Sequence, residues 1–338
     1  MKTTKNIFLV LALVAVLLFC SVGAFAAEET EPALVGYQLN LGDDLTLRMF
    51  VEAQSNTVVE VSVAGKTTSY DLSTITPDEN GRYVIAAHMA ATQMTETITL
   101  NFMQGGVSVS QKTYTIRQYA LEILQGDYPD KTKAMVQQML NYGAAAQQYF
   151  GVNTEKLANA GYEITEEVTL PAEYEATVVS GSIDGMQFYG ASLVCGNKLA
   201  LRYYFTGSVD GVSYGDYEVI EKNGMHYVEV PGINPQDYAK SITLTATKGE
   251  DKLSVSYSPL YYIIRMSEKG STELKTLLNA LYGYHSAAVE YVKRLSQEGA
   301  FFGAAGGYTT TNGFDISKDQ GENATIQAVG NAPVFTPK

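Results

Sequence analysis

Cysteine, histidine and tryptophan are scarce in this sequence, which has two cysteines, three histidines and no tryptophan among 338 residues. Cys20 lies in an N-terminal segment that we expect to be removed, and Phe19 directly before it argues against a lipid anchor on that cysteine. Cys195 then remains alone. One thiol cannot form an internal disulfide, so the burial of apolar side chains has to stabilise the fold. We interpret Cys195 as a small apolar side chain on a strand.

Long apolar runs are absent as well, except at the N-terminus. Lys2 and Lys5 precede the run Ile7 to Cys20, and Ala24-Phe25-Ala26 places small residues at the minus-three and minus-one positions. This pattern predicts a signal peptide over residues 1–26. No later segment reaches the ~20 consecutive apolar residues that a membrane span needs. We therefore expect a mature chain without a transmembrane anchor, secreted or associated with the cell surface.

Basic residues are fewer than acidic ones, at 23 against 36, and the formal net charge is −13. Removal of residues 1–26 would take away two lysines and no acid, which brings the mature chain to −15. Such a charge repels nucleic acid and anionic membranes, so we exclude nucleic acid as a partner. Polysaccharide and other surface proteins remain as candidate partners.

An internal repeat is the most informative pattern in the chain. The stretch "MLNYGAAAQQYF" (139–150) returns as "LYGYHSAAVEYV" (281–292) at an offset of 142 residues. Both copies carry an apolar stripe in steps of four and three residues, which predicts one face of a helix in each. A shorter helix is predicted before each copy, with start signals at Thr115 and Ser258 and stop signals at Gly126 and Gly270.

Upstream of these helices, further landmarks recur in the same order: "LTLR" with "LALR" (45–48 and 199–202), Asn-Gly (80–81 and 223–224), Tyr-Val (83–84 and 227–228) and "ITL" (98–100 and 242–244). The offset falls from 154 to about 143 after the first landmark, which we assign to a surface connection. Apolar and polar residues alternate here, as in strands. The two Asn-Gly pairs and Gly105-Gly106 predict hairpin turns. We expect five to seven strands per copy.

These patterns predict an α+β fold made by tandem duplication, in which each copy is an antiparallel β-sheet or sandwich, immunoglobulin-like (Ig-like), followed by a two-helix hairpin. Repeat domain 1 covers residues 33–152 and repeat domain 2 covers residues 180–295. Residues 153–179 form a linker, with a short helix expected at Thr154–Ala158 and an acidic stretch that suits an extra edge strand. Residues 296–338 form a flexible Gly/Thr/Asn-rich tail, in which only Ala324–Val329 has strand character.

Three segments carry a resemblance to a known module: "MTETITLNF" (94–102), "YTIRQYALEIL" (114–124) and "MLNYGAAAQQYF" (139–150). They look like a repeat module of secreted and cell-surface proteins of Gram-positive gut anaerobes (Clostridia). The resemblance covers both copies and is weaker in the second. It implies an extracellular location, often beside carbohydrate-active or wall-associated proteins, and it carries over no catalytic residue.

Catalytic and metal-ligating patterns are not recognisable. The alignment of the two copies matches His88 with Gly232, His226 with Arg82 and His285 with Gly143. No histidine is matched with another histidine, so neither a duplicated catalytic site nor a duplicated metal site is supported. The tail segment 315–326 resembles an EF-hand calcium loop, but its glycine comes one residue after the position that the loop requires. Ile326 also stands where a bidentate acid should complete the calcium site. We therefore predict no cofactor, no metal and no enzymatic activity.

The outward strand face is where we expect a ligand surface, if one exists. Arg48 and Arg202 occupy equivalent positions, and Phe50 and Tyr204 follow two residues later on the same face. An arginine beside an aromatic ring can hold a polar ring or a carboxylate. A solvated face explains the same residues, and the 24 tyrosines also suit amphipathic positions in the core.

The sequence leaves three functions open. The first is an exported, non-catalytic surface or extracellular protein that acts in adhesion or as a structural spacer. The alternative is a carbohydrate-binding protein that uses Arg48, Phe50, Arg202 and Tyr204. A hydrolase with a single unrecognised site is the third, and it has the least support.

Overall fold

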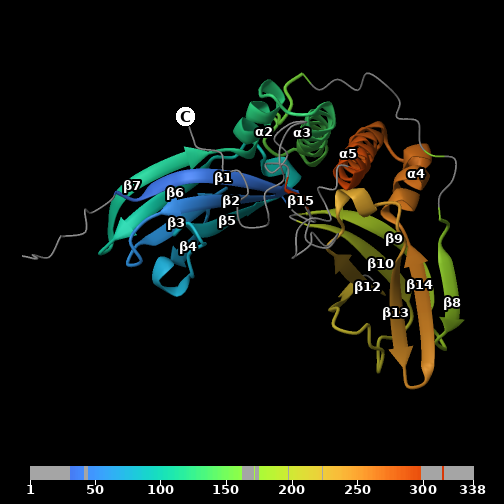
Figure 1. The fold of residues 1–338 in the computed structure, drawn as a ribbon. Helices are drawn as coiled ribbons and strands as arrows, with labels where there is room; N and C mark the ends of the chain where they lie inside the picture. Colours follow the sequence, from blue (N-terminus) through green and yellow to red (C-terminus); the bar gives the residue numbers. More distant parts are fainter. Residues whose placement is uncertain are drawn as a thin grey trace, which may run out of the picture.

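The computed structural model describes residues 31–41, 45–161, 171, 175–196, 198–222, 224–297 and 314–315. The fold is α+β, and all of the strand pairs in this part of the chain are antiparallel. Seven strands and two α-helices make the first half, and the same order returns in the second half (Figure 1). Within the described residues, no helix has the length and apolar character needed to cross a membrane.

The first half folds into two sheets and a helical hairpin. One sheet has the order β15-β1-β2-β5 and the other has the order β4-β3-β6-β7. The elements are β1 (Ala33–Leu41), β2 (Leu45–Glu52), β3 (Val58–Val63), β4 (Lys66–Asp71), β5 (Tyr83–Met89), β6 (Ile98–Gln104), β7 (Val107–Tyr114), α2 (Ile116–Gln125), α3 (Asp130–Phe150) and, from the tail, β15 (Phe314–Asp315).

The second half has the same kinds of element. Its sheets have the orders β11-β12-β10-β9 and β13-β14-β8. The elements are β8 (Val178–Ser182), β9 (Gln187–Cys195), β10 (Leu199–Thr206), β11 (Val219–Lys222), β12 (Met225–Pro231), β13 (Ile242–Lys248), β14 (Asp251–Tyr257), α4 (Pro259–Lys269) and α5 (Thr272–Gln297).

In each half the two sheets are joined through a hydrophobic core. Leu47 and Met49 of β2 are fully buried, whereas Arg48 between them is exposed, as the alternation in the sequence predicts. Between the sheets, the ring centroids of Tyr37 and Tyr114 lie 4.0 Å apart. In the second half the Tyr203 hydroxyl of β10 donates to the Ile242 carbonyl of β13 over 2.7 Å.

The helix boundaries predicted from the sequence are confirmed. Thr115 caps α2 by accepting the Gln118 N–H, and Ser258 caps α4 by accepting the Tyr261 N–H. The second helical residue is anchored in the same way in both halves. The N–H of Arg117 donates to the Met94 carbonyl, and the N–H of Leu260 donates to the Tyr238 carbonyl, each over 2.9 Å. The first turns of α2 and α4 are therefore fixed by equivalent backbone contacts to the ends of the 3-10 turns η2 (Ala91–Gln93) and η3 (Pro235–Asp237).

Helices α3 and α5 lie side by side at the junction of the two halves, and the sheets extend away from them on either side (Figure 1). The pair is antiparallel, since Lys131 in the first turn of α3 forms an ion pair of 3.0 Å with Glu290 near the end of α5. At the middle, Tyr142 and Tyr284 stack with centroids 6.0 Å apart and planes at 10°. These two tyrosines are the ones matched by the 142-residue offset. A contact between matched residues is the property of an isologous, two-fold interface.

The length difference between the halves is not a simple surface connection, contrary to our expectation. Between β2 and β5 the chain forms the β3–β4 hairpin, which belongs to the second sheet and buries Val59 and Val61. Between β10 and β12 there is only β11 and a connection that touches β13 through the Ser213–Thr247 bridge. The additional residues of the first half therefore form a hairpin that adds buried side chains to its hydrophobic core.

Two of the three predicted hairpin turns are confirmed. Gln104 pairs with Val107 around Gly105-Gly106, and Lys222 pairs with Met225 around residues 223–224. The prediction for Asn80-Gly81 is wrong, because the strands on either side, β4 and β5, belong to different sheets. The Asp78 carboxylate accepts the N–H groups of Asn80 and Arg82 and fixes a turn at this crossing instead.

The helix predicted at Thr154–Ala158 is also wrong. The buried Gln147 side chain of α3 donates to the carbonyls of Asn153 and Lys156 and accepts the Ala158 N–H, so these backbone groups are not available for a helix. The signal peptide (1–26), the acidic stretch of the linker (162–174, apart from residue 171) and most of the tail, including Ala324–Val329, lie outside the described residues.

The strands that precede the two helical hairpins, β7 and β14, differ in what lies beside them. β14 pairs with β8 along its outer edge. β7 is the last strand of its sheet, and its pairing with β6 is interrupted by a register shift at Phe102/Met103. Lys112 of β7 stands opposite the buried Leu100 and is itself exposed, so this edge strand carries a charge beside the core.

Two helical glycines allow a matched test of the packing. A Cβ on Gly143 of α3 would come within 2.6 Å of the buried Met94 sulfur and 3.0 Å of the Ala158 Cβ. On Gly283 of α5 the close atom is the end of the Gln138 side chain, which can move. We expect Gly143→Ala to lower the free energy of unfolding by about 1–3 kcal/mol. Gly283→Ala should leave it unchanged or raise it by up to ~1 kcal/mol, because alanine favours the helix. Urea denaturation of both variants measures this, and equal effects would contradict the packing described here.

Candidate functional site

Arg202 and Tyr204 lie together on the outward face of β10, as predicted. The Arg202 Nη1 group donates to the Tyr204 hydroxyl over 3.4 Å, and Ser192 of β9 lies 3.2 Å from the same hydroxyl. The Tyr204 ring is 5.7 Å from the Tyr227 ring of β12, with an interplanar angle of 52°. The face thus combines aromatic area with hydrogen-bonding groups.

Glu229 of β12 holds the Arg202 guanidinium in place. Strand register puts the two residues directly opposite each other, and the carboxylate accepts from Nε over 2.8 Å and from Nη2. The guanidinium carbon lies 4.4 Å from the centre of the Tyr227 ring, so a cation–π contact orients it further. Glu229 and Tyr227 were missed in the sequence, because they join Arg202 only through the pairing of β10 with β12.

Arg48 and Phe50 do not form a comparable site in the first half. Arg48 is exposed on the outward face of β2. Phe50 is only 7% exposed, because the guanidinium of Arg82 covers its ring at 4.8 Å from the centroid. The aromatic position that is accessible in the second half is therefore closed in the first.

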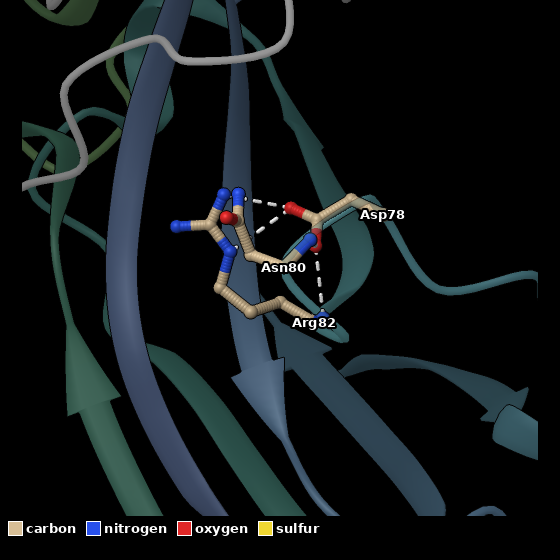
Figure 2. A network of polar contacts seen from close by, with 3 residues as sticks. All are labelled: Asp78, Asn80 and Arg82. Carbon is tan, nitrogen blue, oxygen red and sulfur yellow. Dashed lines mark hydrogen bonds and ion pairs between the residues drawn. The ribbon is translucent and has the colours of Figure 1, made fainter.

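The Asp78 carboxylate positions Arg82 for this contact (Figure 2). The carboxylate Oδ2 accepts from Nε of Arg82 over 2.9 Å and from Nη2 over 2.7 Å, while Oδ1 accepts the backbone N–H groups of Asn80 and Arg82. Burial alone would raise the pKa of Asp78, but the hydrogen bonds from Arg82 and Asn80 lower it below its ordinary value. The ionised carboxylate thus keeps the arginine over Phe50.

Strand register corrects one part of the sequence alignment. Phe50 stands opposite Val84, and Tyr204 stands opposite Tyr227. Tyr227 therefore corresponds to Val84 rather than to Tyr83, and the residue that corresponds to the buried Tyr83 is the buried His226. A one-residue shift along a strand moves a side chain to the other face of the sheet, so the alignment by "YV" had placed Tyr227 on the wrong face.

Two of the histidines lie in the core of the second half. The Nε2 of His226 is 2.6 Å from the Tyr214 hydroxyl, and the ring stacks on Phe205. His285 donates Nδ1–H to the Pro235 carbonyl over 2.6 Å. Burial lowers the pKa of both histidines, against the opposing effects of nearby Glu221 and Asp237. His88, by contrast, is exposed on β5 and contacts Thr46.

A pocket of about 480 Å³ lies beside the start of α2. The N–H groups of Arg117 and Gln118 at this helix end are already bonded to the Met94 carbonyl and the Thr115 hydroxyl, so they are not free to hold an anion. The pocket is lined mainly by Thr95, Thr97, Thr113, Thr115, Arg117, Glu155 and Lys156.

Thiol and metal chemistry have no arrangement to support them in the described residues. Cys195 is half-buried at the end of β9, where burial raises the pKa of its thiol to about 11, although a hydrogen bond with Tyr142 acts in the opposite direction. The thiolate, which is the reactive form, is therefore rare at neutral pH. Within the residues that the structure describes, no three His, Cys, Asp or Glu side chains converge on a metal position.

No protein-family model and no curated protein sequence matches the chain. The candidate site is therefore assessed from its geometry alone.

The contact that closes the first half can be tested at Asp78. We expect Asp78→Ala to lower the free energy of unfolding by about 1–3 kcal/mol, because it removes the charged partner of Arg82. The adjacent, exposed Glu79→Ala is the control and should change it by less than about 0.5 kcal/mol. The pKa of Asp78 is lowered in the folded state. Its contribution to the free energy of unfolding is therefore present above the ordinary pKa of 3.8 and is lost as the pH falls through the lowered pKa. A difference between wild type and variant that grows below pH 3.8 would contradict this.

The buried histidines predict acid sensitivity of the folded state. Their lowered pKa means that unfolding is accompanied by proton uptake once the pH falls below the ordinary value of 6.5. Between pH 7.5 and 5.5 the wild type should lose stability, by at most ~1.4 kcal/mol per histidine and pH unit. In urea denaturation, the double variant His226→Gln/His285→Gln should lose less stability than the wild type over this range. An unchanged pH dependence in the double variant would refute the assignment.

Proposed function

We propose that this chain is an exported, non-catalytic surface or extracellular protein that acts in adhesion or as a structural spacer. The packing of α3 against α5 carries this proposal, because it joins the two halves through stacked tyrosines and an ion pair rather than through a free linker. A rigid block of two sheet units suits a protein that holds other modules at a fixed separation. The N-terminal sequence pattern and the acidic composition support an extracellular location.

We further propose that the two halves arose by duplication of one unit with an Ig-like sandwich. The equivalent helix caps and the equivalent anchoring of Arg117 and Leu260 support this origin, as does the contact between the matched residues Tyr142 and Tyr284. The resemblance to a secreted repeat module of gut anaerobes agrees with it. In this view the α3–α5 interface is the internal form of a two-fold dimer contact.

Rigidity between the halves is the property to measure. Spin labels on Thr68→Cys of β4 and Lys252→Cys of β14, in a Cys195→Ser chain, should give one narrow distance distribution. Tyr142→Ala/Tyr284→Ala should broaden it, because loss of the two buried rings weakens the interface by about 3 kcal/mol or more. Tyr149→Ala, at an exposed position of α3, is the control and should leave it unchanged. A broad distribution in the unmodified interface would overturn the spacer proposal.

Carbohydrate binding is the second candidate, and the Arg202–Tyr204–Tyr227 cluster favours it. The test is retention of the full chain on insoluble polysaccharides. Arg202→Ala and Tyr204→Ala should each abolish retention, while Arg48→Ala should retain it, because only the second half presents an open aromatic face. Binding that survives both second-half substitutions would place the carbohydrate contact elsewhere.

A further inference from the structure

Gly190 leaves an open space beside Tyr204. Strand register puts Gly190 of β9 directly opposite Tyr204, on the side away from Tyr227. A Cβ built on Gly190 would meet no atom within 4 Å. Its backbone is not in the left-handed region, so the torsion angle does not require glycine there. Gly190 lies at the register shift between β9 and β10, and its lack of a side chain leaves the side of Tyr204 that faces away from Tyr227 uncovered.

The surroundings of this gap provide both kinds of contact that a sugar ring uses. Tyr189, next to the gap where β9 and β10 shift register, is 70% exposed, and it adds aromatic area to that of Tyr204. The Ser192 hydroxyl and the Tyr204 hydroxyl lie at the Arg202 end, beside the carboxylate of Glu229. Aromatic faces pack against the C–H face of a pyranose, and a few placed polar groups then fix its hydroxyls.

The charges at the gap favour an uncharged ligand. The Arg202 guanidinium is already paired with Glu229 through Nε and Nη2, so it does not offer an uncompensated positive charge. The whole chain also carries a net charge of −13, which disfavours the approach of polyanions. A sulfated or uronic-acid polymer would therefore bind less well here than a neutral one.

We propose that the face formed by β9, β10 and β12 is a binding subsite for neutral pyranose rings of a polysaccharide, with one ring seated in the gap at Gly190 against Tyr204. This inference rests on the carbohydrate-binding candidate and is independent of the spacer role. In the first half the corresponding aromatic ring, Phe50, is covered by Arg82. Of the outward faces of β2 and β10, only that of β10 has such an open ring among the described residues, and binding there should saturate at one ligand per chain.

Substitution of the glycine tests the proposal. The full chain is titrated by calorimetry with soluble neutral oligosaccharides of glucose, mannose, galactose and xylose, and with oligogalacturonate as the anionic comparison. Gly190→Val fills the gap and should weaken binding of the neutral ligand at least about tenfold, without changing the unfolding midpoint. Gly196→Val is the matched control, since a Cβ there meets only the Lys198 carbonyl at 3.8 Å. Gly196 directly follows the end of β9, about 20 Å along the chain from Gly190. It should bind like the wild type.

Each other outcome has a defined meaning. Wild-type affinity in Gly190→Val would overturn the gap as the subsite, and preferential binding of oligogalacturonate would overturn the neutral ligand class. Absence of binding to every sugar would overturn both this inference and the carbohydrate candidate. The spacer role would then still be decided by the distance measurement, so the two failures are distinguishable.

Discussion

The antiparallel packing of α3 against α5 is the contact on which the arrangement of the whole chain depends. Helix α3 packs on α2 and on the 3-10 turn η2 (Ala91–Gln93), and α5 packs on α4 and on the 3-10 turn η3 (Pro235–Asp237), so a further buried face is needed to hold the halves together. Tyr142, Tyr284 and the small residues around them provide it. Close approach of two helices favours small side chains, and the alanines at 144–146 of α3 are buried. Residues of the repeated apolar pattern, such as Tyr142 and Tyr284, thus also pack the two helices against each other.

The two halves share a framework but differ on their outward faces. A glycine opposite an aromatic ring is present in both, at Gly36–Phe50 and Gly190–Tyr204. In the first half an arginine held by an aspartate covers the ring, and in the second the arginine lies beside the ring and is held by a glutamate from the next strand. The closed face and the open face therefore differ in whether a guanidinium covers the aromatic ring opposite the glycine.

The sequence predicted local features better than pairings. Caps at Thr115 and Ser258 and the turn at Gly105-Gly106 depend on residues within a few positions of each other, and they were correct. The turn at Asn80-Gly81 was assigned to a hairpin because sequence does not show that β4 and β5 join different sheets. For the site, Arg202 and Tyr204 were found from alternation along one strand. Glu229 was not, since its contact with Arg202 depends on the register of β10 with β12.

The sheet edges have a consequence for crowded surroundings. A free edge strand can pair with the edge of a neighbouring molecule, and such pairing can propagate without limit. The outer edge of β7 is protected against this, because its pairing with β6 contains a register shift and Lys112 places a charge on the strand. In copies of this protein packed densely on one surface, the β7 edges should therefore not join neighbouring sheets into a continuous fibre.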